Sequence, residues 1–171
     1  MKQSLIYVFC ISFLFACNND NKTDGGDEFG RVHSINIATF KEQQEFINQL
    51  TVAIVAVKDN NAYSVKTKEL LQLLDSAKVT NDSRIKLLNN IKQVDDDIKF
   101  KDKSLYYAML FDTAFNNEFK IAINILASNK ENKFEIIKQQ VYPTLLKIKE
   151  AEEAFKKADN EMQLKYNIKV E

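Results

Sequence analysis

Cysteine, histidine and clustered carboxylates are the residues of this 171-residue chain whose side chains could do chemistry. The chain contains two cysteines, Cys10 and Cys17, and one histidine, His33. A thiolate acts as a nucleophile or a metal ligand, and an imidazole acts as a general base or a metal ligand. A structural zinc site needs four such ligands, and a catalytic zinc site needs about three. The sequence therefore argues against zinc chemistry, and we expect neither a metal nor a cofactor.

The same residue counts argue against several common enzyme classes. Ser-His-Asp and Cys-His nucleophiles need a histidine beside the nucleophile, and di-iron bundles use paired Glu-x-x-His motifs, which this sequence lacks. All three glycines precede residue 31, so residues 31–171 encode neither a phosphate-binding loop nor a dinucleotide fingerprint. We expect no enzymatic activity, and we expect His33 to be a solvated residue that precedes the folded domain.

An apolar segment leads up to Cys17. Lys2 precedes an almost wholly apolar run, 5–16, which is shorter than the roughly 20 residues that span a bilayer as a helix. A positive start, a short apolar core and a small residue before the cut are typical of a secretory signal peptide. The segment Leu14-Phe15-Ala16-Cys17 resembles the lipobox of bacterial lipoproteins.

This resemblance implies that residues 1–16 are a signal peptide, cleaved before Cys17. It also implies that the Cys17 thiol carries a diacylglyceryl group, with palmitate among its acyl chains, so that the implied partner is a lipid bilayer. Asn18 is not the retention aspartate of enterobacterial lipoproteins, which favours the outer membrane, on its periplasmic face or at the cell surface.

The composition, rich in Asn, Lys, Ile and Phe, is similar to that of small lipoproteins of flavobacteria and other Bacteroidota. It is equally similar to that of helical surface lipoproteins of Borrelia-type spirochaetes. No motif after Cys17 identifies one particular family.

Residues 17–37 are predicted to form a lipidated, flexible and acidic tether. Residues 18–30 hold four acidic residues, one lysine and all three glycines, and they have too little apolar content to offset the entropy of ordering. Across the whole chain 24 basic residues balance 24 acidic ones, which gives no basic footprint for nucleic acid.

Residues 38–171 are predicted to be an all-α domain, an antiparallel bundle of four to five helices. Tight hairpin turns draw on glycine, and this stretch has none. Apolar residues at 3-4 spacing predict helices at about 39–59, 64–78, 80–98, 102–126 and 133–166. Pro143 lies inside the last and longest helix, where its missing N–H predicts a kink.

Two further clusters are candidates for binding. Asp95, Asp96 and Asp97 are predicted to be a solvated C-terminal stretch of the third helix, with a divalent-cation or basic-partner site as the alternative. Tyr106 and Tyr107 are neighbours that point about 100° apart on a helix, so we expect one of them to be exposed.

The sequence thus favours a membrane-anchored, non-enzymatic helical module that binds a protein partner in the envelope. A carboxylate-dependent envelope hydrolase is the first alternative, because glycosidases need only two carboxylates about 5–9 Å apart. The second alternative is a structural envelope protein, a homo-oligomer formed through the long C-terminal helix.

Overall fold

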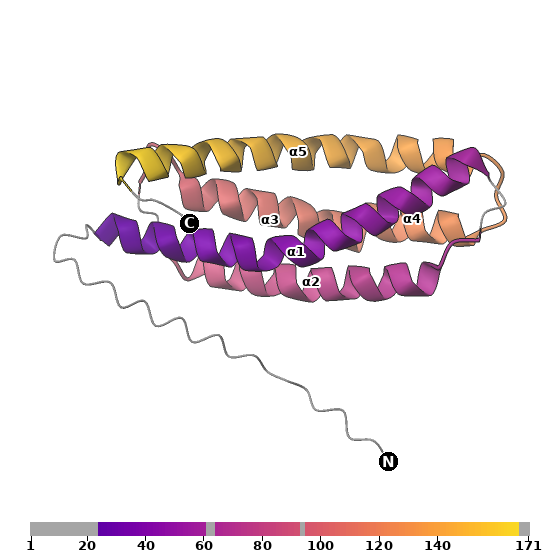
Figure 1. The fold of residues 1–171 in the computed structure, drawn as a ribbon, viewed down its shortest axis with the longest axis horizontal. Helices are drawn as coiled ribbons and strands as arrows, with labels where there is room; N and C mark the ends of the chain where they lie inside the picture. The colour runs from indigo at the N-terminus through magenta and orange to yellow at the C-terminus, as the bar shows by residue number, and fades with distance from the viewer. Residues whose placement is uncertain (1–23, 61–63, 93–94, 168–171) are drawn as a thin grey trace, which may run out of the picture.

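The computed structural model describes residues 24–60, 64–92 and 95–167, and these residues form five helices without any strand. The helices are α1 (Asp24–Asp59), α2 (Thr67–Asn89), α3 (Phe100–Asn116), α4 (Glu118–Ala127) and α5 (Lys133–Lys165). They run lengthwise through an elongated molecule (Figure 1). The all-α class predicted from the sequence is confirmed.

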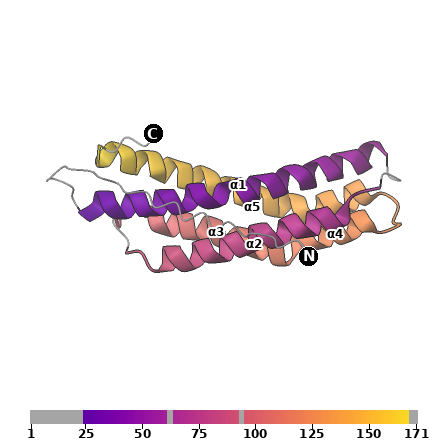
Figure 2. The same cartoon turned by 60° about the horizontal axis from the view of Figure 1, so that its bottom comes forward.

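The five helices form four antiparallel columns, because α3 and α4 follow one another along a single column (Figure 2). Around the bundle α1 packs mainly on α2, α2 on α3, and α5 on the column of α3 and α4. The α1 helix also contacts α5 and closes the ring, so the α3/α4 column lies diagonally across from α1. The predicted antiparallel bundle is therefore present.

The predicted tether is wrong from residue 24 onward, because α1 begins at Asp24 rather than near Thr39. Phe29 and Val32 are almost fully buried. The Phe29 ring lies 5.0 Å from the ring of Phe100, centroid to centroid. The segment is a helix because Phe29 and Val32 are buried in the core at one end of the bundle.

Polar residues explain why the sequence pattern concealed this half of α1. The buried stripe continues from Val32 through Asn36, Thr39 and Gln43 before it reaches Phe46. Each step is three or four residues, which keeps the stripe on one side of the helix. A hydrophobicity pattern treats such polar positions as exposed, so it starts the helix too late.

The α2 helix joins two helices that the sequence predicted separately. The residues expected to cap a new helix lie instead in the middle of α2, where Thr80 and Ser83 donate hydrogen bonds to carbonyl oxygens four residues earlier. Asn81 turns inward and Asp82 pairs with Lys78, so each polar side chain is satisfied without breaking the helix.

The predicted fourth helix is interrupted, whereas the last one is continuous. Asn117 separates α3 from α4 with backbone angles φ −121° and ψ −87°, and its side-chain amide donates to the carbonyl of Thr113. The α5 helix runs through Pro143 as a single helix, as predicted for the last and longest helix.

Two apolar clusters fill the bundle. The smaller one lies where α1 begins and α5 ends, and it includes Phe29, Phe100 and Met162. The larger one fills the rest of the bundle and includes Phe46, Phe115 and Phe119. Between them lies a set of buried polar side chains, named here the polar layer: Asn36, Gln43, Asn81, Arg84 and Ser104.

Gly30 offers a direct check on the helical start of α1. A Cβ added there meets no atom within 4 Å. We expect Gly30→Ala to raise the free energy of unfolding by about 0.5–1 kcal/mol, because alanine loses less backbone entropy than glycine on entering a helix. Urea denaturation of the lipid-free chain 18–171 measures this, and an unchanged midpoint would favour a flexible tether through residue 37.

Candidate functional site

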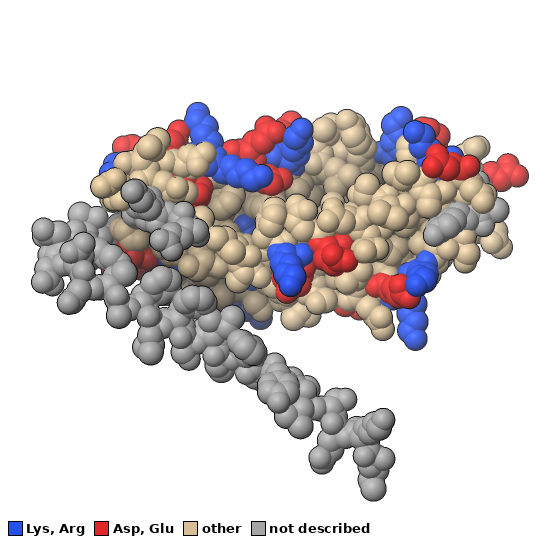
Figure 3. All heavy atoms as spheres, in the orientation of Figure 1, with Lys and Arg blue, Asp and Glu red and all other residues tan. Residues whose placement is uncertain are grey.

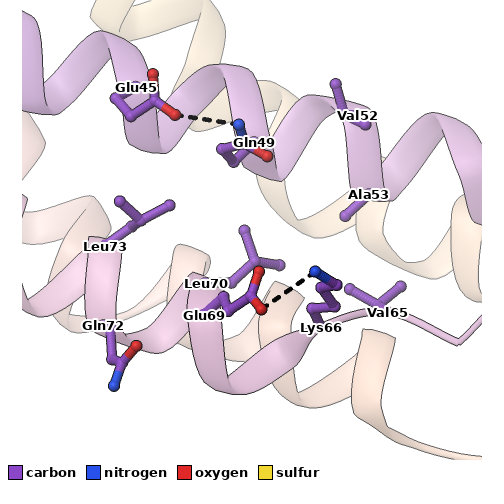
Figure 4. Close-up of a pocket in the computed structure, with 10 residues that line it drawn as sticks. All are labelled: Glu45, Gln49, Val52, Ala53, Val65, Lys66, Glu69, Leu70, Gln72 and Leu73. Atoms are coloured by element: carbon purple, nitrogen blue, oxygen red, sulfur yellow. Dashed lines mark hydrogen bonds and ion pairs between the residues drawn. The ribbon is translucent and has the colours of Figure 1, made fainter.

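An open groove lies between α1 and α2, with a volume of about 480 Å³. It forms because the C-terminal half of α1 swings away from α2 towards α5, whereas the N-terminal half follows α2 (Figure 1). Apolar side chains line it, namely Ala53, Val65, Leu70 and Leu73, and Val52 lies at its edge (Figure 4).

Polar residues also line this α1/α2 groove. Gln49 donates a hydrogen bond of 3.1 Å to Glu45 on α1, and Lys66 lies 3.3 Å from Glu69 on α2 (Figure 4). Both carboxylates are exposed, and each already contacts a residue three or four positions away in the sequence. The arrangement suits the docking of apolar side chains better than acid–base chemistry.

The outer side of α1 beside the groove carries unusually few charges. Between Glu45 and Lys58 the helix has none, although Val52 and Val55 are 64 % and 48 % exposed. In the space-filling view, uncharged atoms form a continuous area over the C-terminal half of α1 (Figure 3). Solvated helix faces are normally charged, so this surface resembles the core of a protein interface.

The acidic run 95–97 differs from its prediction, because α2 ends at Asn89 and the run lies in the loop before α3. Asp96 and Asp97 are exposed as expected, but Asp95 is buried. Asp95 accepts hydrogen bonds of 3.0 Å from the backbone N–H groups of Asp97 and Ile98. It also pairs with Lys165 at the end of α5.

These contacts give Asp95 a structural role in joining the α2–α3 loop to α5. The pairing with Lys165, helped by the two backbone donors, lowers the pKa of Asp95 to about 2. The sequence left a basic-partner site at this acidic run as an alternative, and the basic group that binds Asp95 is a lysine of the same chain. The recess beside Asp95 has a volume of only about 10 Å³, which is too small for a ligand.

His33 is likewise not the solvated residue that the sequence predicted. It lies within α1, and its Nδ1 is 2.8 Å from Oδ1 of Asp159 on α5. A carboxylate only accepts hydrogen bonds, so Nδ1 carries the proton. Asp159 also accepts a bond from Gln163. The pair joins the N-terminal part of α1 to the C-terminal part of α5.

The adjacent tyrosines divide as expected, since Tyr106 is 57 % exposed and Tyr107 only 4 %. Tyr107 packs edge-on against Phe111, with ring centroids 5.3 Å apart. Burial raises the pKa of Tyr107, so its hydroxyl stays protonated. The buried ring belongs to the core, and the exposed one contributes only to the surface of α3.

The polar layer connects three helices through buried hydrogen bonds. Gln43 of α1 donates to Asn81 of α2, which donates in turn to the carbonyl of Ala108 on α3, at 2.8 and 2.9 Å. Ser104 of α3 donates to Asn36 of α1 at 2.7 Å. The sequence alone does not reveal the role of these residues, because their pairing depends on long-range contacts.

Arg84 is the one charged member of the polar layer. Its guanidinium lies 5.0 Å above the ring of Tyr107, and its nearest acceptor is the carbonyl of Ser104 at 3.5 Å. Its Nε atom has no hydrogen-bond partner among the described residues. Desolvation by burial lowers the pKa of Arg84 to about 10. The cation is held by packing and by the ring rather than by a carboxylate.

Other candidate features are few in the described residues. Within 24–60, 64–92 and 95–167 no three His, Cys, Asp or Glu side chains come together as a metal-binding group. No helix in these ranges is both long enough and apolar enough to cross a bilayer. The predicted signal peptide, Cys17 and the first part of the predicted tether lie outside the described residues.

Comparison with known proteins identifies no relative: the chain matches no protein-family model, no curated protein and no solved structure.

The ion pair of Asp95 predicts a specific dependence of stability on pH. A carboxyl whose pKa is lowered on folding stabilises the protein above its unfolded pKa of about 4, and this stabilisation is lost as the pH falls to about 2. We expect Asp95→Asn to be less stable than the unmodified chain at pH 7, with the difference shrinking between pH 4 and pH 2.

Urea denaturation at several pH values measures this difference, and Asp96→Asn is the matched control because Asp96 is exposed. An Asp95→Asn deficit that stays constant down to pH 2 would contradict the assignment.

Proposed function

We propose that this chain is an outer-membrane lipoprotein, anchored through acylated Cys17, and that its helical bundle is a non-enzymatic module for binding a protein partner. The observation that carries the proposal is the segment Leu14–Cys17 at the end of an apolar run too short to span a bilayer. Two or three acyl chains on one cysteine make release from a bilayer negligible.

The start of the bundle is consistent with such an anchor. The α1 helix begins at Asp24, only seven residues after Cys17. Seven residues span at most about 25 Å. An anchored bundle therefore stays close to the membrane surface, and its outer faces are available to other envelope components.

The α1/α2 groove and the uncharged outer face of α1 support binding as the task of the bundle. Helix-in-groove recognition places the apolar face of a helix in a groove that apolar side chains line, and Ala53, Leu70 and Leu73 are among the residues that line this groove. Exposed apolar surface with few charges is the composition of interface cores.

The buried carboxylates give no comparable support to a hydrolase. A general acid needs a carboxyl whose pKa is raised towards neutrality. Asp95 instead has a lowered pKa because it is paired with Lys165. Asp159 is already bound by His33 and Gln163.

Substitution of Cys17 tests the anchor. We expect Cys17→Ala to abolish incorporation of labelled palmitate and to move the protein from the membrane fraction to the soluble fraction, because the acyl chains are attached to this thiol. Cys10→Ala is the matched control, since Cys10 lies within the predicted signal peptide and should leave both readouts unchanged. If Cys17→Ala still took up palmitate and stayed with membranes, the lipoprotein assignment would be wrong.

A further inference from the structure

We propose that the partner of this module is a second copy of the same chain, and that two α1 helices pair antiparallel through their outer faces about a two-fold axis. This inference rests on the proposed function, because it names the partner of the surface already assigned to binding.

A continuous seam of exposed residues runs along the outer side of α1. Its members recur at steps of three and four residues, which places them on one side of the helix, as in paired helices. They are Lys41, Gln44, Asn48, Val52, Val55 and Asp59, and every one is exposed. None of the four central members carries a charge.

The two charged members make the seam self-complementary. Lys41 and Asp59 are 18 residues apart, about five helical turns, so they lie on the same side of α1 with opposite charge. In an antiparallel pair centred on residue 50, Lys41 of each copy lies against Asp59 of the other. Two ion pairs then flank an uncharged centre.

Within the part of one copy that the structure describes, neither charge is paired. Among the described residues Lys41 and Asp59 have no ion-pair or hydrogen-bond partner, whereas most exposed charges of α5 pair within that helix. At the centre of the seam, Asn48 of one copy opposes Val52 of the other. Val52 also lies at the rim of the α1/α2 groove, so the seam of one copy borders the groove of the other copy.

A two-fold axis suits this surface because both copies contribute the same patch. An isologous interface requires a patch that is complementary to itself and closes at the dimer, without forming filaments. A seam with a positive end, an uncharged centre and a negative end meets that requirement only in the antiparallel orientation.

The arrangement also determines how a lipidated dimer lies on a membrane. Asp24 is 26 residues from the centre, about 39 Å along the helix, so the two α1 helices begin roughly 80 Å apart. Both anchors reach one bilayer when the long axis of the dimer lies along the surface.

Sedimentation equilibrium of the lipid-free chain 18–171 tests the proposal. This chain contains the buried core residues that the structure describes, from Phe29 to Met162. We expect a reversible monomer–dimer equilibrium between about 1 and 500 µM. Reversal of one charge, Lys41→Asp, should weaken the dimer by at least about tenfold, because it places two like-charged pairs across the interface.

The double variant Lys41→Asp/Asp59→Lys restores opposite charges and should recover the dimer. Lys120→Asp is the matched control, since it makes the same change of charge at an exposed site on α4, in the column diagonal to α1, and should leave the dimer intact. Val52→Lys should abolish association while the circular dichroism spectrum stays helical.

A monomer at every concentration, or a dimer that is equally weakened in the single and double charge variants, would overturn the proposal. Palmitate labelling of Cys17 is independent of this result, so failure of the dimer and failure of the anchor are distinguishable.

Discussion

The buried hydrogen bonds of the polar layer are the constraint on which the rest of this bundle depends. Apolar stripes that repeat every turn permit two helices to pack in more than one alignment, whereas the bonds from Gln43 to Asn81 and from Ser104 to Asn36 form in only one. A slip of one turn would leave these groups buried without partners, at a cost of about 1–3 kcal/mol for each. The polar layer therefore sets the alignment of α1, α2 and α3.

This alignment also determines the surface that is available for binding. The N-terminal half of α1 is held against α2 and α3 by Asn36 and Gln43, whereas the C-terminal half diverges from α2 and opens the groove (Figure 1). The seam from Lys41 to Asp59 starts beside the polar layer and continues along the diverging half. The residues of the seam therefore have fixed positions along one helix. An interface with an ion pair at each of its two distant ends requires such fixed positions.

The sequence predicts the helical class and the long last helix well, because the absence of glycine and the apolar spacing across Pro143 are local signals. It predicts the start of α1 poorly for a physical reason: the buried stripe there passes through Asn36 and Gln43. Each makes one hydrogen bond to another helix, although Asn36 Nδ2 and Gln43 Oε1 have no partner among the described residues. The same long-range dependence conceals the roles of Asp95 and His33. The exposed seam was equally hidden, because exposure is known only once the packed face of α1 is known.

The most direct test of this account replaces a buried polar pair with apolar residues of similar size, in the double variant Gln43→Leu/Asn81→Leu. The account predicts a chain that remains helical and stable but loses its single alignment, since apolar groups pack in several registers. Two-dimensional amide NMR spectra of the chain 18–171 should then show broadened or multiple peaks for α1 and α2. A single sharp set of peaks, as well dispersed as that of the unmodified chain, would show that apolar packing alone fixes the alignment and would contradict the account.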